Sequence, residues 1–544
     1  MTLEQAFALH QQGRTAAAEQ AYSELLRRNP RDGRVLHLLG LLTAGQGQFA
    51  RGIELIRRAL EIDPRRFLAH RDLGNVLLQS GDFARALESF DRALALKPGQ
   101  ADILDGRGTA LRMLGRLDAA LASHDRALAL SPGLVLAHIN RGSALAGLNR
   151  FAAALESFDR AIALDGTSVL AHSNRGSALH RLERFNEALE SHDRAAALAP
   201  GIAHIHIGRG QALAELGRYD QAVDSFERAL ALEPQSAEAQ FGRATSLLVM
   251  GRFRTGWQAY EGRKRRVSAD AFHPQGRPQW SGREDIAGKI LFVEGEQGLG
   301  DMIQFCRYAK LCADKGAAVI LTARESQLRL LESLDPRIEI RPQASWPTTF
   351  DYHIPLMSLP LAFDVAEDGF AAATPYLRAE SERVTHWQQQ IGDKGLKIGI
   401  CWQGGPGNLA RSFPLAALAE IGKRPDVRLI SLQKGAGAEQ LDGGSIPVES
   451  LGEDYDTGPD AFLDAAAVME AVDLVISCDT SLAHLAGALA RPVWVALKFA
   501  PDWRYLTGRD DSPWYPGMRL FRQDRPGDWQ SVFAKMAAAL DQTP

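Results

Sequence analysis

The stretch ALESFDRALALKPGQADILDGRGTALRMLGRLDAALASHDRALALSPG, residues 86–133, decides the fold of the first half of the chain. Its segment ALESFDRALALKP (86–98) returns almost unchanged as ALASHDRALALSP (120–132), 34 residues later. The prolines that end successive copies have the same spacing of 34 residues: Pro30, Pro64, Pro98, Pro132, Pro200 and Pro234. Between Pro132 and Pro200 one copy has Gly166 in place of the proline. Each copy holds two apolar-periodic segments, and its proline cannot continue a helix. The period therefore predicts a stack of helix pairs.

This pattern resembles the tetratricopeptide repeat. One copy carries the small, aromatic and proline residues that are typical of this family, at Gly74, Ala86, Phe90, Ala93 and Pro98. About eight copies fit between residue 3 and about residue 268, so we expect an all-α superhelix over residues 1–268. Such helix pairs bury their apolar faces only against their neighbours, and the stack forms a concave groove. A repeat array predicts an interaction module and implies no chemistry by itself.

Polar side chains recur inside the array at the repeat period. Arginines stand at Arg107, Arg141, Arg175 and Arg209, and asparagines precede two of them at Asn140 and Asn174. A second row consists of His70, His138, His172 and His206. One interpretation is a groove of hydrogen-bond donors that holds a protein or glycan acceptor. The other is that the side chains pack between helices while their polar ends reach water.

Composition restricts the class of protein. The 544 residues carry a net charge of −4, with 62 basic and 66 acidic side chains, which gives no indication of a nucleic-acid partner. No apolar run is long enough for a transmembrane segment or a signal peptide. Four scattered cysteines indicate neither a disulfide scaffold nor a metal site, so we expect a cytoplasmic protein.

The pattern changes in the second half of the chain. Residues 269–284 lack the repeat and are expected to form a linker. Apolar strands then alternate with helices in two series, which predicts two Rossmann-like lobes, residues 285–380 and 397–544. Together they predict a two-lobed α/β region with a cleft at the carboxyl ends of the strands, where such folds bind ligands.

Four loops that follow predicted strands carry the candidate functional residues. GEQGLGD (295–301) places Gly298 and Gly300 before Asp301, which could equally be a helix cap. CWQGGPGNLARSFPL (401–415) brings Arg411 to a glycine-rich loop, where an arginine suits a phosphate. Two further loops, after the strands VRLI and DLVI, supply Gln433 and then Asp479, Thr480, Ser481 and His484. The hydroxyl groups and free N–H groups of this last helix start predict an anion site.

These loops resemble those of the bacterial heptosyltransferases of lipopolysaccharide assembly, a GT-B family. The resemblance covers about residues 284–542 and rests on Gly300-Asp301, on the basic residue before FPL, and on Asp479-Thr480-x-x-x-His484. Repeats followed by such a domain are also similar in layout to protein O-linked N-acetylglucosamine transferases.

The resemblance implies inverting glycosyl transfer from a nucleotide-diphosphate sugar, without a metal or another cofactor. It assigns Asp301 as the general base on the acceptor hydroxyl. Arg411, Asp479, Thr480, Ser481 and His484 are implied to hold the diphosphate, and Gly298, Gly300 and Gln433 complete the donor site. An arginine at 411, where the family often has lysine, and an unfamiliar segment after residue 500 leave the donor sugar and the acceptor open.

Two other functions compete with this one. The chain could be a non-catalytic interaction scaffold whose second half binds a nucleotide sugar without turnover. A dinucleotide-dependent oxidoreductase is disfavoured because the Gly-x-Gly-x-x-Gly pattern is missing. Exposed repeat faces often self-associate, so a homo-oligomer is also among the expected assemblies.

Overall fold

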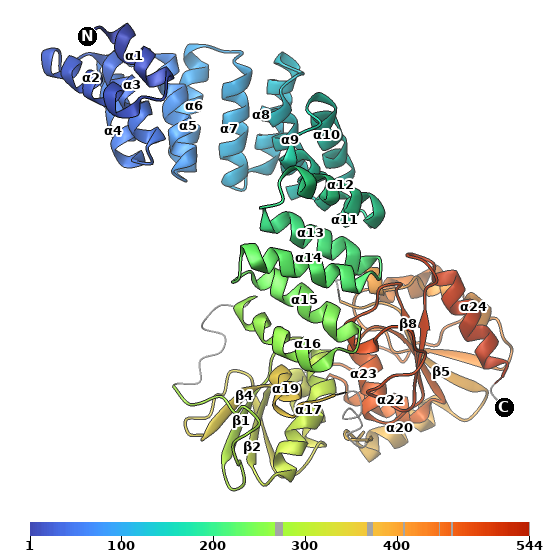
Figure 1. Cartoon of the computed structure of the whole chain (residues 1–544). Coiled ribbons are helices and arrows are strands. Elements are labelled where there is room, and N and C mark those ends of the chain that lie inside the picture. The colour runs from blue at the N-terminus through green and yellow to red at the C-terminus, as the bar shows by residue number, and fades with distance from the viewer. Residues whose placement is uncertain (267–275, 367–373, 406–408, 445, 459–460, 543–544) are drawn as a thin grey trace. The chain divides into compact units, whose positions relative to one another are not determined.

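The structure is a computed structural model that describes residues 1–266, 276–366, 374–405, 409–444, 446–458 and 461–542. It divides into two compact units, Met1–Arg209 and Gly210–Pro544, which are considered separately below. The first unit is entirely helical, and the second combines helices with two parallel sheets (Figure 1). An all-α repeat array followed by an α/β region is therefore confirmed as the fold class.

The first unit is built from antiparallel helix pairs, each pair one repeat long. The helices are α1 (Leu3–Gln11), α2 (Thr15–Arg28), α3 (Gly33–Gly45), α4 (Phe49–Ile62), α5 (Phe67–Gln79), α6 (Phe83–Leu96), α7 (Ala101–Met113), α8 (Leu117–Leu130), α9 (Val135–Gly147), α10 (Phe151–Leu164), α11 (Val169–Arg181) and α12 (Phe185–Leu198). The division between the units falls inside the next helix, α13 (Ala203–Glu215).

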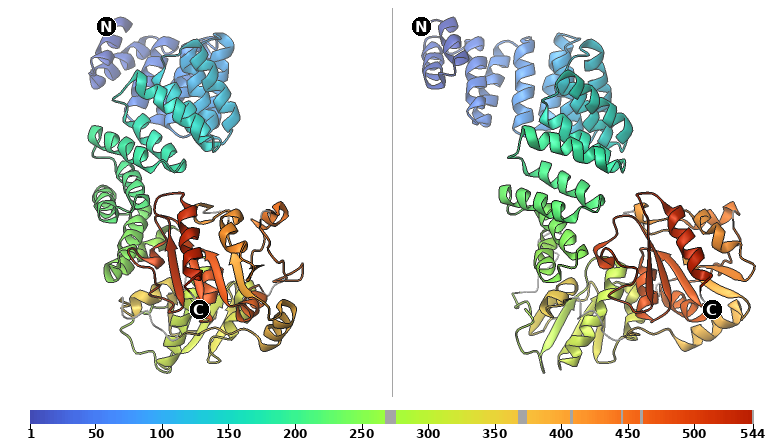
Figure 2. Two further views of the ribbon diagram at one scale, coloured as in Figure 1. Left: turned by 90° about the vertical axis from the view of Figure 1, so that its right-hand side faces the viewer. Right: turned by 45° about the vertical axis from the view of Figure 1, so that its right-hand side comes forward.

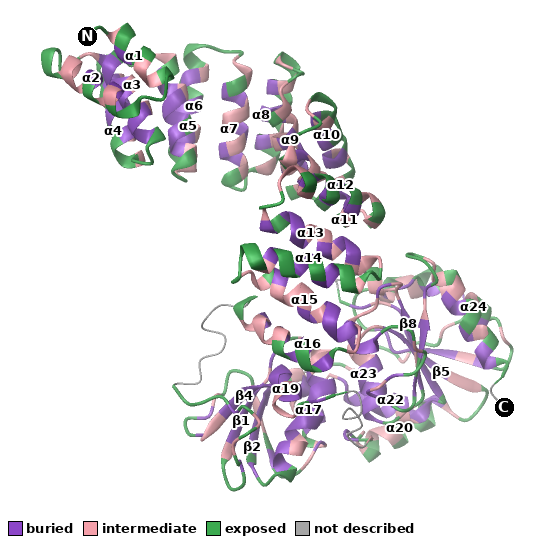
Figure 3. Cartoon of the chain, in the orientation of Figure 1, coloured by how far each residue is buried: buried purple, intermediate pink, exposed green. Residues whose placement is uncertain are grey.

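Neighbouring helices pack closely where an aromatic ring lies against glycines. The Phe90 ring of α6 is buried between Gly74 of α5 and Gly106 of α7, where an added Cβ would lie 2.6 and 2.8 Å from the ring. Side chains larger than hydrogen would therefore separate the helices at these positions. Buried residues accordingly line the sides of the helices that face their neighbours (Figure 3).

The second unit begins with the last helices of the repeat array. These are α14 (Tyr219–Leu232), α15 (Ala237–Val249) and α16 (Phe253–Tyr260), followed by a 3-10 segment, η1 (Glu261–Arg266). Trp257 and Tyr260 of α16 are buried in the same hydrophobic core as residues of the two sheets. This part of the array is thus continuous in packing with the α/β region.

The first sheet has four parallel strands in the order β3-β2-β1-β4. The strands are β1 (Ile290–Glu294), β2 (Ala318–Ala323), β3 (Ile338–Pro342) and β4 (Tyr352–Pro355). Helix α17 (Leu299–Asp314) connects β1 to β2, and the shorter helices of this lobe are α18 (Leu328–Glu332) and α19 (Leu359–Ala362), with the 3-10 turns η3 (Glu325–Gln327) and η4 (Leu356–Ser358). The inner strand β2 and its neighbour β1 are nearly continuous apolar runs because helices cover the sheet, whereas the edge strand β3 carries Glu339 and Arg341.

The second sheet has five parallel strands in the order β6-β5-β7-β8-β9. They are β5 (Leu396–Cys401), β6 (Val427–Ser431), β7 (Leu474–Cys478), β8 (Val493–Leu497) and β9 (Met518–Arg522). Its helices are α20 (Ser381–Ile391), α21 (Ala419–Gly422), α22 (Leu463–Ala471), α23 (Ser481–Ala488) and α24 (Trp529–Leu540), with 3-10 turns η6 (Leu409–Arg411), η7 (Leu415–Leu418), η8 (Ala438–Gly443) and η9 (Trp503–Tyr505). The two sheets are separate within the second unit (Figure 2).

The sequence pattern missed one strand of the second sheet. β9 lies in the segment after residue 500 that shows no strand alternation of its own, yet it pairs with β8 from Val493↔Met518 to Leu497↔Arg522. β9 is an edge strand that is stabilised by its pairing with β8 alone. Periodicity within the segment gives no sign of this pairing.

Candidate functional site

The second unit contains a cavity of about 940 Å³ where the loops after the parallel strands converge. It brings together nine of the residues singled out in the sequence: Gly298, Gly300, Asp301, Arg411, Gln433, Asp479, Thr480, Ser481 and His484. Gly298 precedes α17, Gly300 and Asp301 lie in its first turn, and the others come from the second lobe. Parallel strands place their carboxyl ends at one edge of each sheet, which explains this convergence.

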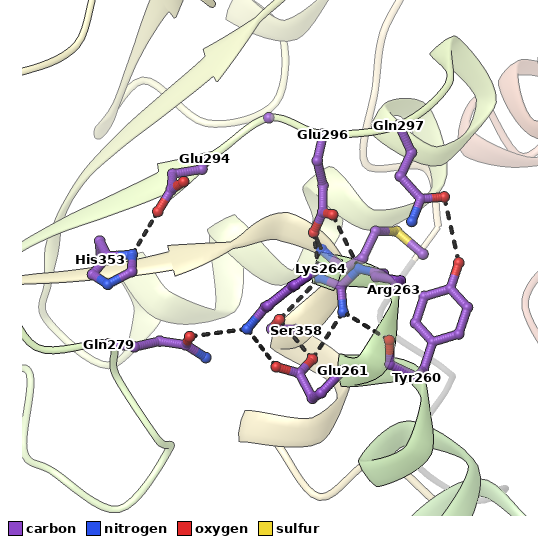
Figure 4. A network of polar contacts seen from close by, with 12 residues as sticks. Tyr260, Glu261, Arg263, Lys264, Gln279, Glu294, Glu296, Gln297, His353 and Ser358 are labelled. Atoms are coloured by element: carbon purple, nitrogen blue, oxygen red, sulfur yellow. Dashed lines mark hydrogen bonds and ion pairs between the residues drawn. The ribbon is translucent and has the colours of Figure 1, made fainter. Parts of the chain in front are cut away.

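The turn between β1 and α17 is held by close backbone packing and by a buried ion pair. Gly295 is required because a Cβ there would lie 2.1 Å from the carbonyl oxygen of Thr322. Gln297 adopts a left-handed backbone (φ 65°), which is strained for a residue other than glycine. Its neighbour Glu296 forms a buried ion pair with Arg263 of η1 (Figure 4).

Asp301 caps the start of α17 and also faces a cation. Its Oδ2 accepts a hydrogen bond at 2.8 Å from the N–H of Gly298, which is the N-cap residue, so Asp301 closes the helix start from the third helical position and is not itself the N-cap. Its Oδ1 forms an ion pair with Arg504 of η9. The Arg504 guanidinium also donates to Asp502 at 2.7 Å and to Gln304 at 2.9 Å, and lies 4.2 Å above the Trp503 ring. The aspartate is therefore shared between a structural cap and a buried charge network.

Arg411 lines the cavity and makes no hydrogen bond or ion pair with the part of the chain that the structure describes. Its Nε is buried and makes no hydrogen bond among the described residues. Gly404 gives it room, since a Cβ there would lie 2.8 Å from that nitrogen. A buried donor without an acceptor costs free energy, so this guanidinium is suited to an anion that fills the cavity.

The start of α23 lies beside the same cavity. Thr480 is the N-cap residue, and its hydroxyl contacts Ser477 at 3.0 Å and makes no cap hydrogen bond to the helix. Gly300 of the first lobe packs closely here, because an added Cβ would lie 3.1 Å from His484 and 3.4 Å from the Cα of Ser481. The first turn of α23 thus presents N–H groups to the cavity close to the turn that carries Asp301.

Two titratable groups of this region are shifted toward their neutral forms. Burial, together with the negative charge of Asp502, raises the pKa of Asp479 to about 6. Arg411 and Arg504 oppose this rise, as does a hydrogen bond at 3.0 Å from the Tyr505 hydroxyl to the Asp479 carboxylate. Burial, followed by the positive charges of Arg504, Arg307 and Arg411, lowers the pKa of His484 well below its usual range. His484 is therefore neutral at pH 7, with Nδ1 3.3 Å from the Tyr515 hydroxyl.

Gln433 braces the loops of the second lobe. Its Oε1 accepts from the backbone N–H groups of Trp402 and Gln403 at 3.1 and 2.9 Å. Its Nε2 donates to the carbonyls of Gln403 and Ala436 at 3.0 and 2.9 Å. The side chain ties the loop after β5 to the loop after β6, and its polar atoms are already engaged.

The last repeats supply a further wall of the cavity. Its lining includes Glu215, Tyr219, Phe241, Thr245, Ser246 and Tyr260. Glu215 of α13 forms an ion pair with Lys498, just after β8, at 2.9 Å. The hydroxyl of Tyr219 is buried and has no hydrogen-bond partner among the described residues. The cavity therefore joins a polar floor from the lobes to a mixed aromatic and hydroxyl wall from the helices.

The arginines of the first unit are engaged inside the array. Arg107 donates from Nε to Asp91 and from Nη1 to Ser123, both at 2.6 Å. Asp91 lies 16 residues before Arg107 in the sequence, and Ser123 lies 16 residues after it. Arg141 and Arg175 repeat this arrangement, and Arg209 contacts Asp193 at 2.6 Å. Each of Arg107, Arg141 and Arg175 bridges the second helices of consecutive repeats, which accounts for a ladder at the repeat period without any ligand.

The asparagines and histidines of the array also have internal partners. Asn140 donates to the Asp105 carboxylate at 3.0 Å, and Asn174 contacts the Ser143 hydroxyl at 3.4 Å. Each histidine of the second row bonds the carbonyl six residues earlier, at the turn between repeats, at 3.0, 2.9, 3.1 and 2.8 Å for His70, His138, His172 and His206. An acceptor role for the ladder stays a prediction.

Sequence reasoning missed the partners of Asp301 and Asp479. Arg504, which pairs with Asp301, Asp502, which pairs with Arg504, and Tyr505, which donates to Asp479, come from the segment PDWRY, which has no strand or helix periodicity. The only signal was two charged residues beside two aromatic rings directly after a predicted strand. Such a combination at a strand end deserves the same attention as a glycine-rich loop.

Two absences concern only the described residues. No three histidine, cysteine, aspartate or glutamate side chains among them are grouped as a metal site. None of the described helices combines the length and the apolar character that crossing a membrane requires.

Comparison with known proteins identifies the repeats. Tetratricopeptide repeat models match residues 3–66, 71–135, 136–168 and 167–248. Protein FlbA of Caulobacter vibrioides is 30% identical over 320 residues, which cover 52% of this chain. The match also covers 52% of FlbA, so the chain spans about half of the length of this relative.

Solved structures with a similar chain trace are repeat proteins. YrrB, a TPR protein with an unusual peptide-binding site, is 25% identical with a TM-score of 0.29, over 34% of this chain and 94% of YrrB. The Cut9–Hcn1 hetero-tetramer of APC/C is 16% identical with a TM-score of 0.40, over 44% of this chain and 48% of that one. A tetratricopeptide repeat protein of Parabacteroides merdae is 15% identical, with a TM-score of 0.39 over 45% and 97% of the two chains. The family models show that the N-terminal half of this chain consists of tetratricopeptide repeats.

Proposed function

We propose that the chain is a metal-independent, inverting glycosyltransferase that uses a nucleotide-diphosphate sugar. The observation that carries this proposal is the composition of one cavity. Asp301 lies on one wall, and Arg411, with its unpartnered buried Nε, lines the same cavity as the N–H groups at the start of α23. A carboxylate and a separate anion site in one cavity are what such a transfer needs.

In the proposed reaction the acceptor hydroxyl attacks the anomeric carbon while Asp301 takes its proton. The new C–O bond forms as the bond from that carbon to the diphosphate oxygen breaks. The nucleoside diphosphate leaves with the electron pair, and Arg411, Thr480, Ser481 and the N–H groups of α23 stabilise its charge. Neutral His484 adds a hydrogen-bonding group beside them. No cofactor enters this scheme.

Arg504 imposes a condition on this chemistry. Its ion pair with Asp301 occupies the oxygen that would accept the proton. Asp502 and Gln304 also hold the guanidinium, so a small rotation toward an incoming diphosphate would free Asp301 and still leave Arg504 paired. Donor binding would then prepare the base.

We place the acceptor against the wall of the cavity that the last repeats form. Tyr219, Phe241 and Thr245 face the cavity from helices that continue the array. An acceptor held there would reach Asp301 without crossing the donor. A protein acceptor suits an array of tetratricopeptide repeats, because such arrays bind polypeptides in their concave face.

A non-catalytic scaffold is the alternative, and the Asp301–Arg504 pair is the observation that favours it. A permanently paired aspartate would leave a nucleotide-sugar-binding domain without a base.

Two measurements separate these functions. A thermal-shift screen of UDP-, GDP- and ADP-sugars against NAD should identify the donor. Asp301→Asn should then retain donor binding and lower transfer or donor hydrolysis by about 10²-fold or more, because general-base catalysis contributes about 10²–10⁴-fold. Its melting temperature should stay near that of the wild type, since asparagine can still cap α17 and Arg504 keeps Asp502. Donor binding without turnover by the wild type would favour the scaffold.

A further inference from the structure

The turn that carries Asp301 is joined to the last repeat through a buried ion pair. Arg263 of η1 is 4% exposed and Glu296 is 9% exposed. The guanidinium contacts both carboxylate oxygens of Glu296, with Nε–Oε2 at 3.0 Å and Nη2–Oε1 at 2.5 Å (Figure 4). Two parallel hydrogen bonds fix direction as well as distance.

Further contacts make this junction rigid on both sides. Arg263 also donates to the Ser358 hydroxyl at 3.0 Å and to Glu261 at 2.9 Å. Glu296 in turn accepts from the backbone N–H of Met357 at 2.8 Å. A buried ion pair is held in one geometry when its remaining donors and acceptors are satisfied in this way.

The same helix end reaches the next residue of the turn. The Tyr260 hydroxyl of α16 donates to the Gln297 side chain at 3.4 Å. Gln297 is the residue with the left-handed backbone, and it directly precedes Gly298, whose N–H is bonded to Asp301. A strained turn keeps its conformation only when its surroundings fix it.

We infer that Arg263 is a positioning residue for Asp301, and that the last repeat is a working part of the catalytic lobe. Arg263 orients Glu296, which with Tyr260 fixes the turn at Gln297 and Gly298 and so sets the place of the Asp301 carboxylate. This inference rests on the proposed function only for its effect on turnover. The ordering of the turn itself is independent of any activity.

The test compares two arginines that each pair with a carboxylate of the first lobe. Arg263→Lys keeps the charge but loses the two-pronged contact with Glu296. Arg254→Lys is the matched control, because Arg254 makes a two-pronged contact with Asp364 at 3.1 and 2.8 Å on the exposed side of α16, away from the turn. Hydrogen–deuterium exchange of the full-length protein is followed for a peptide that spans residues 294–302.

Arg263→Lys should speed amide exchange in this peptide by about tenfold or more, while Arg254→Lys leaves it unchanged. Transfer should fall by about tenfold or more in kcat, because a misplacement of about 1 Å costs up to about 10²-fold. Affinity for UDP, GDP or ADP should fall by a smaller factor than kcat, since Arg411 and the start of α23 belong to the other lobe and only Gly298 and Gly300 of the donor site belong to the turn.

Tyr260→Phe provides a second variant if lysine at 263 prevents folding. It removes one hydroxyl and keeps the packed ring, so it should speed exchange of the same peptide in the same direction by a smaller factor. Equal exchange in Arg263→Lys and Arg254→Lys, or no change in Tyr260→Phe, would overturn the inference. If the wild-type protein has no transfer activity, the proposed function is wrong. The exchange rates of the peptide 294–302 then still test whether Arg263 positions the turn.

Discussion

His192 illustrates how a single residue can fit a repeat and still behave differently. It takes the place that Phe90, Phe158 and Phe226 hold in other repeats, and its ring is buried against Gly176 and Gly208. Its Nδ1 has no hydrogen-bond partner among the described residues. Burial, with His180 and His204 nearby, lowers its pKa to about 4, and Asp193 only partly opposes this.

This depressed pKa predicts a pH-dependent stability of the array. The unfolded chain binds a proton on His192 below about pH 6.5, whereas the folded chain binds it only below about 4. Stability from this site is therefore complete above pH 6.5 and is lost as the pH falls from about 6.5 to 4, by about 3 kcal/mol in total. His192→Phe should remove that loss, so its melting temperature should exceed that of the wild type at pH 5 by more than it does at pH 7.5.

Exposed His386 of α20 is the control for this prediction, because it has no part in the electrostatics of His192. His386→Gln should leave the pH dependence of the melting temperature close to that of the wild type. A His192→Phe variant with an unchanged difference between pH 5 and pH 7.5 would show that the ring is already hydrated in the folded protein.

At the residue scale the strand-end loops of the sequence indicated residues that line one cavity in the structure. Asp301, Arg411 and Asp479 each follow an apolar strand, and parallel sheets bring such positions to one edge. Arg504 could not be found in this way, because its position depends on contacts with Asp301 and Gln304 that lie about 200 residues away in sequence. The Arg263–Glu296 pair was invisible for the same reason.

At the element scale the repeat helices depend on side-chain bridges as well as on apolar packing. Arg141 of α9 reaches Asp125 of α8 at 2.6 Å and Ser157 of α10 at 2.7 Å. A helix pair is therefore tied to its successor by a polar contact above its core. The 34-residue period revealed that the arginines belong together, but the 16-residue offsets to their partners became evident only in the folded array.

Arg141→Ala should weaken the array at these bridges. Loss of one half-exposed ion pair and one hydrogen bond should lower the free energy of unfolding by about 1 kcal/mol, and less in high salt. The measurement is urea denaturation followed by circular dichroism at two salt concentrations. Exposed Arg126 of α8 is the control, and Arg126→Ala should change stability by less than about 0.5 kcal/mol.

The same pair of variants distinguishes the two interpretations of the ladder. A bridge predicts lower stability and an unchanged acceptor KM for Arg141→Ala. Unchanged stability with a raised acceptor KM would instead support a groove that binds the acceptor, and would contradict the bridging role.

At the scale of the second unit, the sequence pattern and the packing differ about where the α/β region begins. Composition placed the first lobe at residue 285, where the strand pattern starts. Packing includes α14 to α16 in the same unit, because Trp257 meets Trp503 at a ring distance of 5.2 Å and Phe305 at 6.3 Å. Periodicity detects elements, but it does not record which neighbour buries an aromatic face.

The final prediction concerns two truncated chains. A chain of residues 203–544 keeps α13 to α16 and should retain a cooperative unfolding transition and nucleotide binding. A chain of residues 285–544 exposes Trp503 and Phe305 and removes Arg263, the ion-pair partner of Glu296. Loss of buried aromatic contacts costs about 2–3 kcal/mol for each ring, and the turn at Glu296 loses its support as well. Because a domain is stable by only about 5–15 kcal/mol, the shorter chain should aggregate or lose its near-ultraviolet circular dichroism. A monomeric 285–544 chain with native near-ultraviolet dichroism would show that the last repeats are dispensable for the lobes.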